Sequence, residues 1–177
     1  MKKVSKAVLS AALLATLAGC SSKSEDTSLK DVQSAGELKI GLEGDWQPFS
    51  YHDEDDNLVG YDVEVATKVA EKLGVKAVIT EGPWDGLLTG LDTGVYDVVV
   101  NGVDVTPERS ETFDFTDAYA YDHIDLVVKK DNTTITSFED LKGKKSANST
   151  GSTYAEMGEE YGATVSNVPT LAETMEL

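Results

Sequence analysis

The alternation of short apolar segments with amphipathic ones between residues 37 and 102 limits the possible folds more than any other feature of this chain. The apolar segments are rich in Val, Ile and Leu, as buried strands are. The segments between them have apolar side chains at helical spacing. We expect strands at 37–43, 75–80 and 96–102, and helices at 62–73 (between Asp62 as cap and Gly74 as stop) and 84–91. This order predicts an α/β fold with a parallel sheet.

Such a fold also predicts where a ligand binds, because open parallel sheets bind ligands beside the carboxyl ends of their strands. The first predicted strand ends at Glu43, and the third ends at Asn101 and Gly102. Trp46 and Asp104 follow these two strand ends closely. We therefore expect all five residues to face one crevice.

A second, smaller series of elements follows residue 122. We expect a strand at 123–131, a short helix from Ser137 to Gly143, a strand at 144–148 and a helix from Ser152 or Thr153 to Tyr161. Thr170 and Glu173 then form a capping box, which predicts a helix that begins just before the sequence ends. We therefore expect one lobe at 37–122, and a hinge with a partial second lobe at 123–177, in a piece of a longer protein.

Residues 1–19 are predicted to be a bacterial lipoprotein signal peptide. Basic residues precede an apolar run that is too short to span a bilayer, and small residues then lead to Cys20. Lipidation of Cys20, with palmitate among the acyl chains, would remove the chain's only thiol. Residues 20–36 are then expected to be the lipidated cysteine and a flexible tether outside the cytoplasmic membrane. The alternative is a plain secretory signal with an unrelated cysteine.

The formal net charge of −17 excludes several classes of partner. A chain this acidic repels nucleic acid and anionic membrane surfaces, so neither is expected as a direct partner. The apolar fraction of 40% indicates a globular chain rather than a disordered one.

Arg109 is the first candidate for binding a ligand. Thr106 is predicted to cap a helix with Pro107 at its first position, which places Arg109 in the first turn. A cation there opposes the helix dipole, so local stability does not explain the arginine. Its planar fork of donors fits a carboxylate. The alternative is a surface ion pair, with Glu108, Glu111 or Asp114 as the partner.

A second anion site is predicted where the small residues near Ser152 and Thr153 open a helix, since free N–H groups there attract negative charge. An ordinary helix cap is the alternative. Trp46 and Trp84 are candidate aromatic walls for an apolar or sulfur-containing side chain. Phe49 fits a packing role better.

Metal and enzyme sites are weakly indicated. Asp53, Asp55, Asn57 and Glu64 have the spacing of a calcium loop, but Leu58 stands where that loop needs glycine. A solvated hairpin tip is the better interpretation. Two histidines and one cysteine cannot form a zinc cluster, and no cofactor is expected. Carboxylates are numerous, so an acid–base pair stays open as an alternative.

Four stretches resemble the extracytoplasmic solute-binding proteins of polar amino-acid ABC importers. They are LKIGLEGDWQPFSY, LVGYDVEVATKVAEKLGVK, WDGLLTGLDTGVYDVVVNGVDVTPERSETFDFTDAY and FEDLKGKKSANSTGSTYAE, and they cover most of residues 37–160. The resemblance implies a type II periplasmic-binding fold, in which two α/β lobes close on one amino acid. It further implies delivery to an ABC permease and a binding protein without catalytic activity, which we expect to be a monomer.

The resemblance also implies roles for individual residues. Arg109 would grip the α-carboxylate of the ligand, Trp46 would stack on the ligand, and Trp84 would line its side-chain pocket. The backbone of residues 101–104 would contact the amino group and the carboxylate. The family's acidic residue for the ammonium group falls outside this chain.

In the second lobe, Ser152 and Thr153 would complete the carboxylate site. Two positions depart from the family, because Asp104 replaces a small hydroxyl residue and Gly102 replaces a frequent glutamine. Other details look most like the cystine-binding branch, which makes cystine the leading ligand. Asp104 either accepts a hydrogen bond from a ligand ammonium or pairs with Arg109 and competes with the ligand.

Two other functions use the same fold. One is a sensor module that signals instead of importing, and a membrane-spanning segment further along the chain would favour it. The other is a dehydratase-like enzyme acting on a small carboxylic acid, because a fold alone does not define a function.

Overall fold

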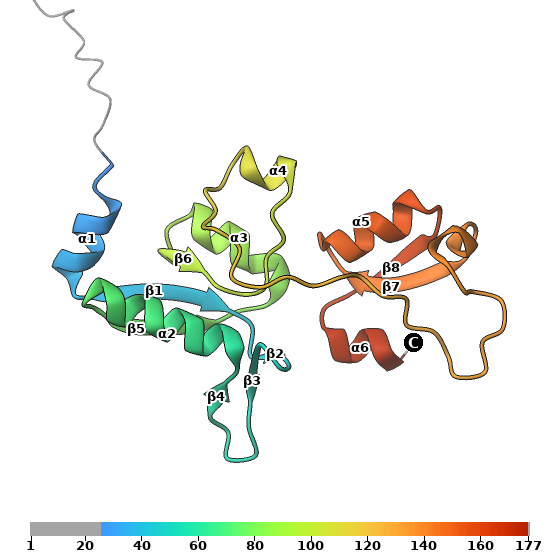
Figure 1. Cartoon of the computed structure of the whole chain (residues 1–177), viewed down its shortest axis with the longest axis horizontal. Coiled ribbons are helices and arrows are strands. Elements are labelled where there is room, and N and C mark those ends of the chain that lie inside the picture. The colour runs from blue at the N-terminus through green and yellow to red at the C-terminus, as the bar shows by residue number, and fades with distance from the viewer. Residues whose placement is uncertain (1–25, 177) are drawn as a thin grey trace, which may run out of the picture.

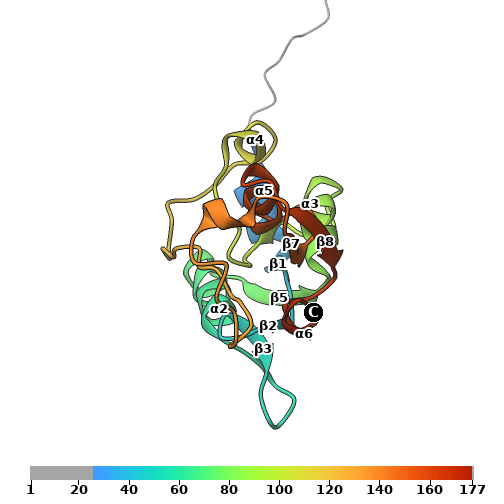
Figure 2. The same cartoon turned by 90° about the vertical axis from the view of Figure 1, so that its right-hand side faces the viewer.

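Two α/β lobes joined by a long extended segment make up the computed structural model, which describes residues 26–176 (Figure 1). The first lobe contains α1 (Ser28–Ala35), β1 (Glu37–Leu42), β2 (Asp45–Trp46), β3 (Ser50–His52), β4 (Leu58–Val59), α2 (Tyr61–Leu73), β5 (Lys76–Glu81), α3 (Trp84–Asp92), β6 (Val98–Val99) and α4 (Pro107–Ser110). The second contains the 3₁₀ helix η1 (Phe138–Leu141), β7 (Lys145–Ser149), α5 (Thr153–Glu160), β8 (Thr164–Val168) and α6 (Leu171–Glu176). Figure 2 shows the molecule from the side of the second lobe.

The main sheet of the first lobe has the order β5–β1–β6, and both pairings are parallel. Glu37 lies opposite Lys76, and Ile40 lies opposite Val98. The α/β sheet predicted from the sequence is therefore confirmed. A separate three-stranded antiparallel sheet, β2–β3–β4, follows β1 and carries Trp46.

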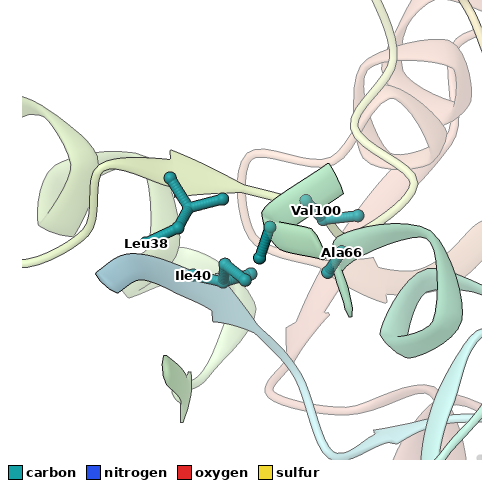
Figure 3. Packing of buried hydrophobic residues seen from close by; sticks show 5 residues of the cluster. Leu38, Ile40, Ala66 and Val100 are labelled. Carbon is teal, nitrogen blue, oxygen red and sulfur yellow. The ribbon is translucent and has the colours of Figure 1, made fainter. Parts of the chain in front are cut away.

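Helices cover both faces of this sheet. On one face, Leu38 and Ile40 of β1 pack with Val100 against Ala66 and Ala70 of α2 (Figure 3). Alanine at these two positions lets the helix lie close to the strand. On the other face, α3 contacts β1 and β6.

The α3 face depends on two glycines. A Cβ at Gly41 of β1 would lie 2.6 Å from the ring of Tyr96, and one at Gly90 of α3 would overlap the same ring. The tyrosine ring therefore fills the space that side chains at these two positions would need, and the helix packs over it.

Helix α2 agrees with the prediction in its end but not in its start. Gly74 has a left-handed φ of 75° and ends the helix as expected. Gly60, not Asp62, occupies the N-cap position, and Asp62 lies in the first turn. Val69 of this helix is 40% exposed, outside its buried face.

Strand β6 is shorter than the predicted strand at 96–102. The N–H of Lys39 donates to the carboxylate of Asp97 at 2.8 Å. A side chain thus takes the place of a main-chain acceptor, and the regular ladder is limited to Val98 and Val99.

The prediction of a strand at 123–131 is wrong. This part of the segment between the lobes contains no regular element, and Val127 and Val128 are 72% and 42% exposed. A strand requires a hydrogen-bonded neighbour, and no strand among residues 26–176 pairs with it. The apolar alternation alone could not reveal this lack of a partner.

The other elements predicted for the second lobe form, and β8 is present in addition to them. Strands β7 and β8 pair in parallel, with Lys145 opposite Thr164, and both contact α5 and α6. Ser137 and Asp140 form a capping box on the short helix η1. Ser152 caps α5, and its Oγ accepts from the N–H of Ala155 at 3.1 Å.

The predicted tether at residues 20–36 is only partly covered by the described residues. Its described part includes helix α1, so the expectation of a flexible segment fails there. The helix ends at Gly36, where φ is 73°. The signal peptide and Cys20 lie outside the described residues. Among residues 26–176, no helix has the length and apolar character that crossing a bilayer requires.

Candidate functional site

The ends of β1 and β6 meet through Glu43 and Asn101, as the parallel sheet predicted. The N–H of Glu43 donates to Asn101 Oδ1, and Asn101 Nδ2 donates to Glu43 Oε2, both at 2.7 Å. The two residues are only 6% and 3% exposed. Burial raises the pKa of Glu43, and the bond from Asn101 opposes this only in part. This edge of the sheet therefore contains a carboxyl group that a nearby cation would stabilise in its charged form.

Arg109 reaches both lobes from the first turn of α4. Thr106 caps this helix by accepting from the N–H of Arg109 at 3.1 Å, as predicted. The guanidinium donates to the main-chain oxygens of Asp104 and Gly151, each at 3.0 Å. Its Cζ atom lies 5.5 Å from the centre of the Trp84 ring. The arginine thus joins the loop after β6, the start of α3 and the turn before α5.

The alternative role of Arg109 in a surface ion pair is not what the structure contains. Within residues 26–176, its hydrogen bonds go to main-chain oxygens, and no carboxylate of Glu108, Glu111 or Asp114 pairs with it. The positive charge therefore stands beside the crevice without a carboxylate partner.

Asp104 also bridges the lobes, through its side chain. Its Oδ2 accepts a short hydrogen bond from the hydroxyl of Thr153. Only the main-chain oxygen of Asp104, not its carboxylate, bonds Arg109. The carboxylate therefore points across the crevice, where it can meet a ligand as well as Thr153.

Aromatic rings from the first lobe contact the same turn of the second. The indole Nε1 of Trp84 donates to the main-chain oxygen of Thr150 at 3.1 Å. The rings of Trp46 and Tyr154 stack with their centres 6.5 Å apart and their planes 14° apart. Phe49 instead packs edge-on against Tyr61, which agrees with its expected packing role.

These contacts surround one cavity between the lobes. It encloses about 30 Å³, room for roughly one or two water molecules, so a bound ligand would have to displace some of these contacts. All the predicted ligand residues except Arg109 line it, together with Ser149 and Tyr154: Glu43, Trp46, Trp84, Asn101, Gly102, Asp104, Ser152 and Thr153. Arg109 borders it through Asp104 and Trp84. The wall combines buried acceptors, hydroxyl groups and aromatic faces.

Sequence reasoning missed Tyr154 and the main-chain oxygens of Thr150 and Gly151. Tyr154 directly follows the predicted anion turn, so its position beside the site was the available signal. Every residue has a main-chain oxygen, so the residue types could not indicate which of these oxygens lie at the site. The predicted N–H groups of that turn are partly in use, because Ser152 N–H donates to the oxygen of Ser149 at 3.2 Å.

The acidic hairpin tip forms a turn held by its own side chains. Asp53 Oδ1 accepts from the N–H groups of Asp55 and Asn57 at 3.0 and 2.9 Å. No group of three or more potential metal ligands occurs among residues 26–176.

Residues 38–174 match a family described as bacterial extracellular solute-binding proteins, family 3. The chain belongs to this family. Among curated relatives, this solute-binding protein is 39% identical to the L-cystine-binding protein TcyA of Bacillus subtilis, over 100% of the chain and 69% of that protein. It is 40% identical to the L-cystine-binding protein TcyJ of Escherichia coli K12, over 85% of the chain and 58% of that protein.

A solved structure shows the same fold. The ancestral amino acid-binding protein AncCDT-1, a precursor of cyclohexadienyl dehydratase, superposes on the solute-binding protein with a TM-score of 0.75. The two are 34% identical, over 84% of this chain and 68% of that one. The fold is the type II periplasmic-binding fold, in which the second lobe is only partly present here. The family is one of extracellular proteins, which places this solute-binding protein outside the cytoplasm.

Proposed function

We propose that this solute-binding protein binds a polar amino acid outside the cytoplasmic membrane and delivers it to an ABC permease. The observation that carries the proposal is the position of Arg109, whose guanidinium lies beside the cavity and bonds main-chain oxygens of both lobes. A ligand carboxylate is a stronger acceptor than a neutral carbonyl oxygen. It would therefore replace one or both of these oxygens and hold the two lobes together.

The ammonium group of the ligand would meet the acidic side of the cavity. Glu43 and Asp104 both line it, and burial raises the pKa of Glu43. A bound ammonium would favour the charged form of that carboxyl and so lower its pKa. A guanidinium beside the cavity and two carboxyl groups in its lining suit a zwitterion better than a simple acid.

Cystine is the ligand that we propose first. Two of the similar proteins are named as L-cystine-binding proteins. The rings of Trp46, Trp84 and Tyr154 border the cavity, and aromatic rings make favourable contacts with sulfur.

The remaining parts of the proposal concern the whole protein. The chain spans 69% and 58% of the two cystine-binding relatives. We propose lipid attachment at Cys20, a monomeric state and a binding role without catalysis. Residues 1–19 would be removed as a signal peptide. Appearance of product when the protein is incubated with small carboxylic acids would contradict the absence of catalysis.

The test is a thermal-shift panel of the common amino acids and L-cystine on the protein as its gene encodes it, followed by calorimetry. A ligand that binds only the folded state raises the melting temperature. We expect L-cystine to give the largest shift. A shift with a different amino acid would keep the function and replace the ligand, whereas no shift and no heat with any amino acid would overturn the proposal.

A further inference from the structure

Asp62 is a buried carboxyl group for which the proposed site has no direct use. Its side chain is 0% exposed. Oδ1 accepts from the hydroxyl of Tyr119 at 3.0 Å, and Oδ2 is buried without a hydrogen-bond partner of good geometry. The helix does not need it as a cap, since Gly60 occupies that position. A buried carboxyl is costly, so its retention here calls for another role.

The main chain at Asp62 holds the loop that carries Trp46. The N–H of Asp62 donates to the oxygen of Phe49 at 2.8 Å, and the N–H of Tyr61 donates to that of Pro48 at 3.2 Å. The start of α2 is thus fixed to the loop between β2 and β3. Trp46 lies at the beginning of this loop and stacks on the second lobe.

The carboxyl group of Asp62 faces the loop after β6. Asp62, Tyr119 and Gly102 line one cavity, and the backbone of Gly102 lowers the pKa of both Asp62 and Tyr119. Gly102 has a φ of 58° and lines the cavity between Asn101 and Asp104. The Tyr119 hydroxyl and the Gly102 loop therefore lie beside the same buried carboxyl.

Tyr119 connects this junction to the segment that runs to the second lobe. The hydroxyl of Tyr61 donates to the main-chain oxygen of Tyr119 at 2.9 Å, and the two rings lie 6.0 Å apart. Burial and the neighbouring Asp62 raise the pKa of Tyr119, so its hydroxyl stays protonated and donates. Three segments that carry or connect the site therefore meet at Asp62: the Trp46 loop, the Gly102 loop and the inter-lobe segment.

We infer that Asp62 and Tyr119 act together as positioning residues for the ligand site, by fixing the Gly102 loop and the inter-lobe segment onto the start of α2. This inference rests on the proposed amino-acid site. Neither residue needs to touch the ligand. Their effect is transmitted through Gly102 and through the direction in which the chain leaves the first lobe.

Two conservative variants test this directly. Asp62→Asn keeps the shape but turns one acceptor into a donor that faces the other donors, and Tyr119→Phe removes only the hydroxyl. Ile40→Val serves as the control, because it lowers stability in the core and touches none of the junction. Each variant and the double variant would be measured for L-cystine affinity by calorimetry, and for exchange of the Gly102 amide hydrogen by NMR without ligand.

We expect each junction variant to weaken L-cystine binding about tenfold and to speed Gly102 exchange by a similar factor, as the loss of one buried polar contact implies. Because the two residues share one contact, the double variant should lose little more than the worse single variant. Ile40→Val should lower the melting temperature while its affinity stays within about twofold of wild type.

Two results would overturn the inference. One is unchanged affinity in both junction variants; the other is a Gly102 exchange rate that follows the melting temperature equally in the junction and control variants. If the wild-type protein binds no amino acid, the proposed function fails, and Gly102 exchange alone then decides whether Asp62 and Tyr119 hold the loop.

Discussion

Single residues at the cavity offer groups for both charges of an amino acid. Arg109 provides donors beside it, and Glu43 and Asp104 line it with carboxyl groups. Within residues 26–176 the Arg109 guanidinium bonds main-chain oxygens, so a ligand carboxylate would displace neutral acceptors and not a competing carboxylate. Substitutions of single residues are therefore the most direct test of ligand binding.

Arg109→Ala should weaken amino-acid binding by about 3–5 kcal/mol, because a desolvated charge pair is broken. Arg109→Lys keeps the charge without the planar fork and should fall between the alanine variant and wild type. Calorimetry on the protein as its gene encodes it gives both values. An affinity for the alanine variant close to that of wild type would remove Arg109 from the site.

Glu43→Gln should change how stability depends on pH. Because the pKa of Glu43 is raised above its ordinary 4.5, the folded chain binds this proton more tightly than the unfolded chain. Wild type should therefore lose stability, relative to the glutamine variant, as pH rises from about 4.5 through the raised value. Above that value the difference should stay constant. Urea unfolding of both proteins between about pH 4 and 8 measures it, and a difference that is flat across this range would contradict the assignment.

Much of the site could be predicted at this scale, and the reason is physical. Glu43 and Asn101 follow strands whose ends must meet in a parallel sheet. The apolar pattern of the sequence was therefore enough to predict that the two residues lie together. The side-chain direction of Asp104 could not be predicted, because the sequence does not say whether its carboxylate accepts a hydrogen bond from Thr153 or from Arg109. The prediction of Asp62 as a helix cap was wrong, since its partner Tyr119 lies 57 positions away.

At the scale of elements, the start of α2 is packed tightly against the loop that precedes β3. Gly60 has a φ of 127°, and a Cβ there would overlap the main-chain oxygen of Phe49. That oxygen is also the acceptor for Asp62 N–H. The helix, the hairpin and the loop that carries Trp46 are therefore fixed to one another at a single glycine.

Gly60→Ala should destabilise the fold by at least about 1–3 kcal/mol, from backbone strain together with the clash at Phe49. Gly74→Ala is the matched control, since Gly74 also has a positive φ but a Cβ added there would meet no atom within 4 Å. The control should cost about 1–2 kcal/mol from strain alone. Equal midpoints for the two variants in urea would contradict the role assigned to the Phe49 contact.

Elements were predictable where local pattern and pairing agree. Residues 62–73 and 144–148 carry their helix and strand signals within themselves, and both elements form. Residues 123–131 alternate as a strand does, yet no strand among the described residues accompanies them. Strand formation is settled by a neighbour, and a neighbour is not a local property.

The whole molecule is held in its present form by contacts across the cavity. Thr153 donates to Asp104, Tyr154 stacks on Trp46, and Arg109 bonds the turn before α5. Thr153 and Tyr154 take part through their side chains, whereas the second lobe meets Arg109 through a main-chain oxygen. The two kinds of contact can therefore be removed separately.

Thr153→Val should loosen the approach of the lobes in the ligand-free protein, because Asp104 loses the hydroxyl that donates to it. We expect a larger radius of gyration in small-angle scattering. Thr150→Val is the control, since Thr150 contributes only its main-chain oxygen to Trp84, and its scattering should match wild type. If the Thr153 variant scatters as wild type does, the side-chain bridge does not hold the lobes.

The choice of main-chain oxygens as the partners of Arg109 has a consequence for how such a protein can change during evolution. Those oxygens remain whatever side chains stand at positions 104 and 151. Residue 104 can therefore be exchanged to admit a differently charged ligand while the arginine keeps its supports. Carboxylate anchoring and ligand choice can thus be inherited as separate traits.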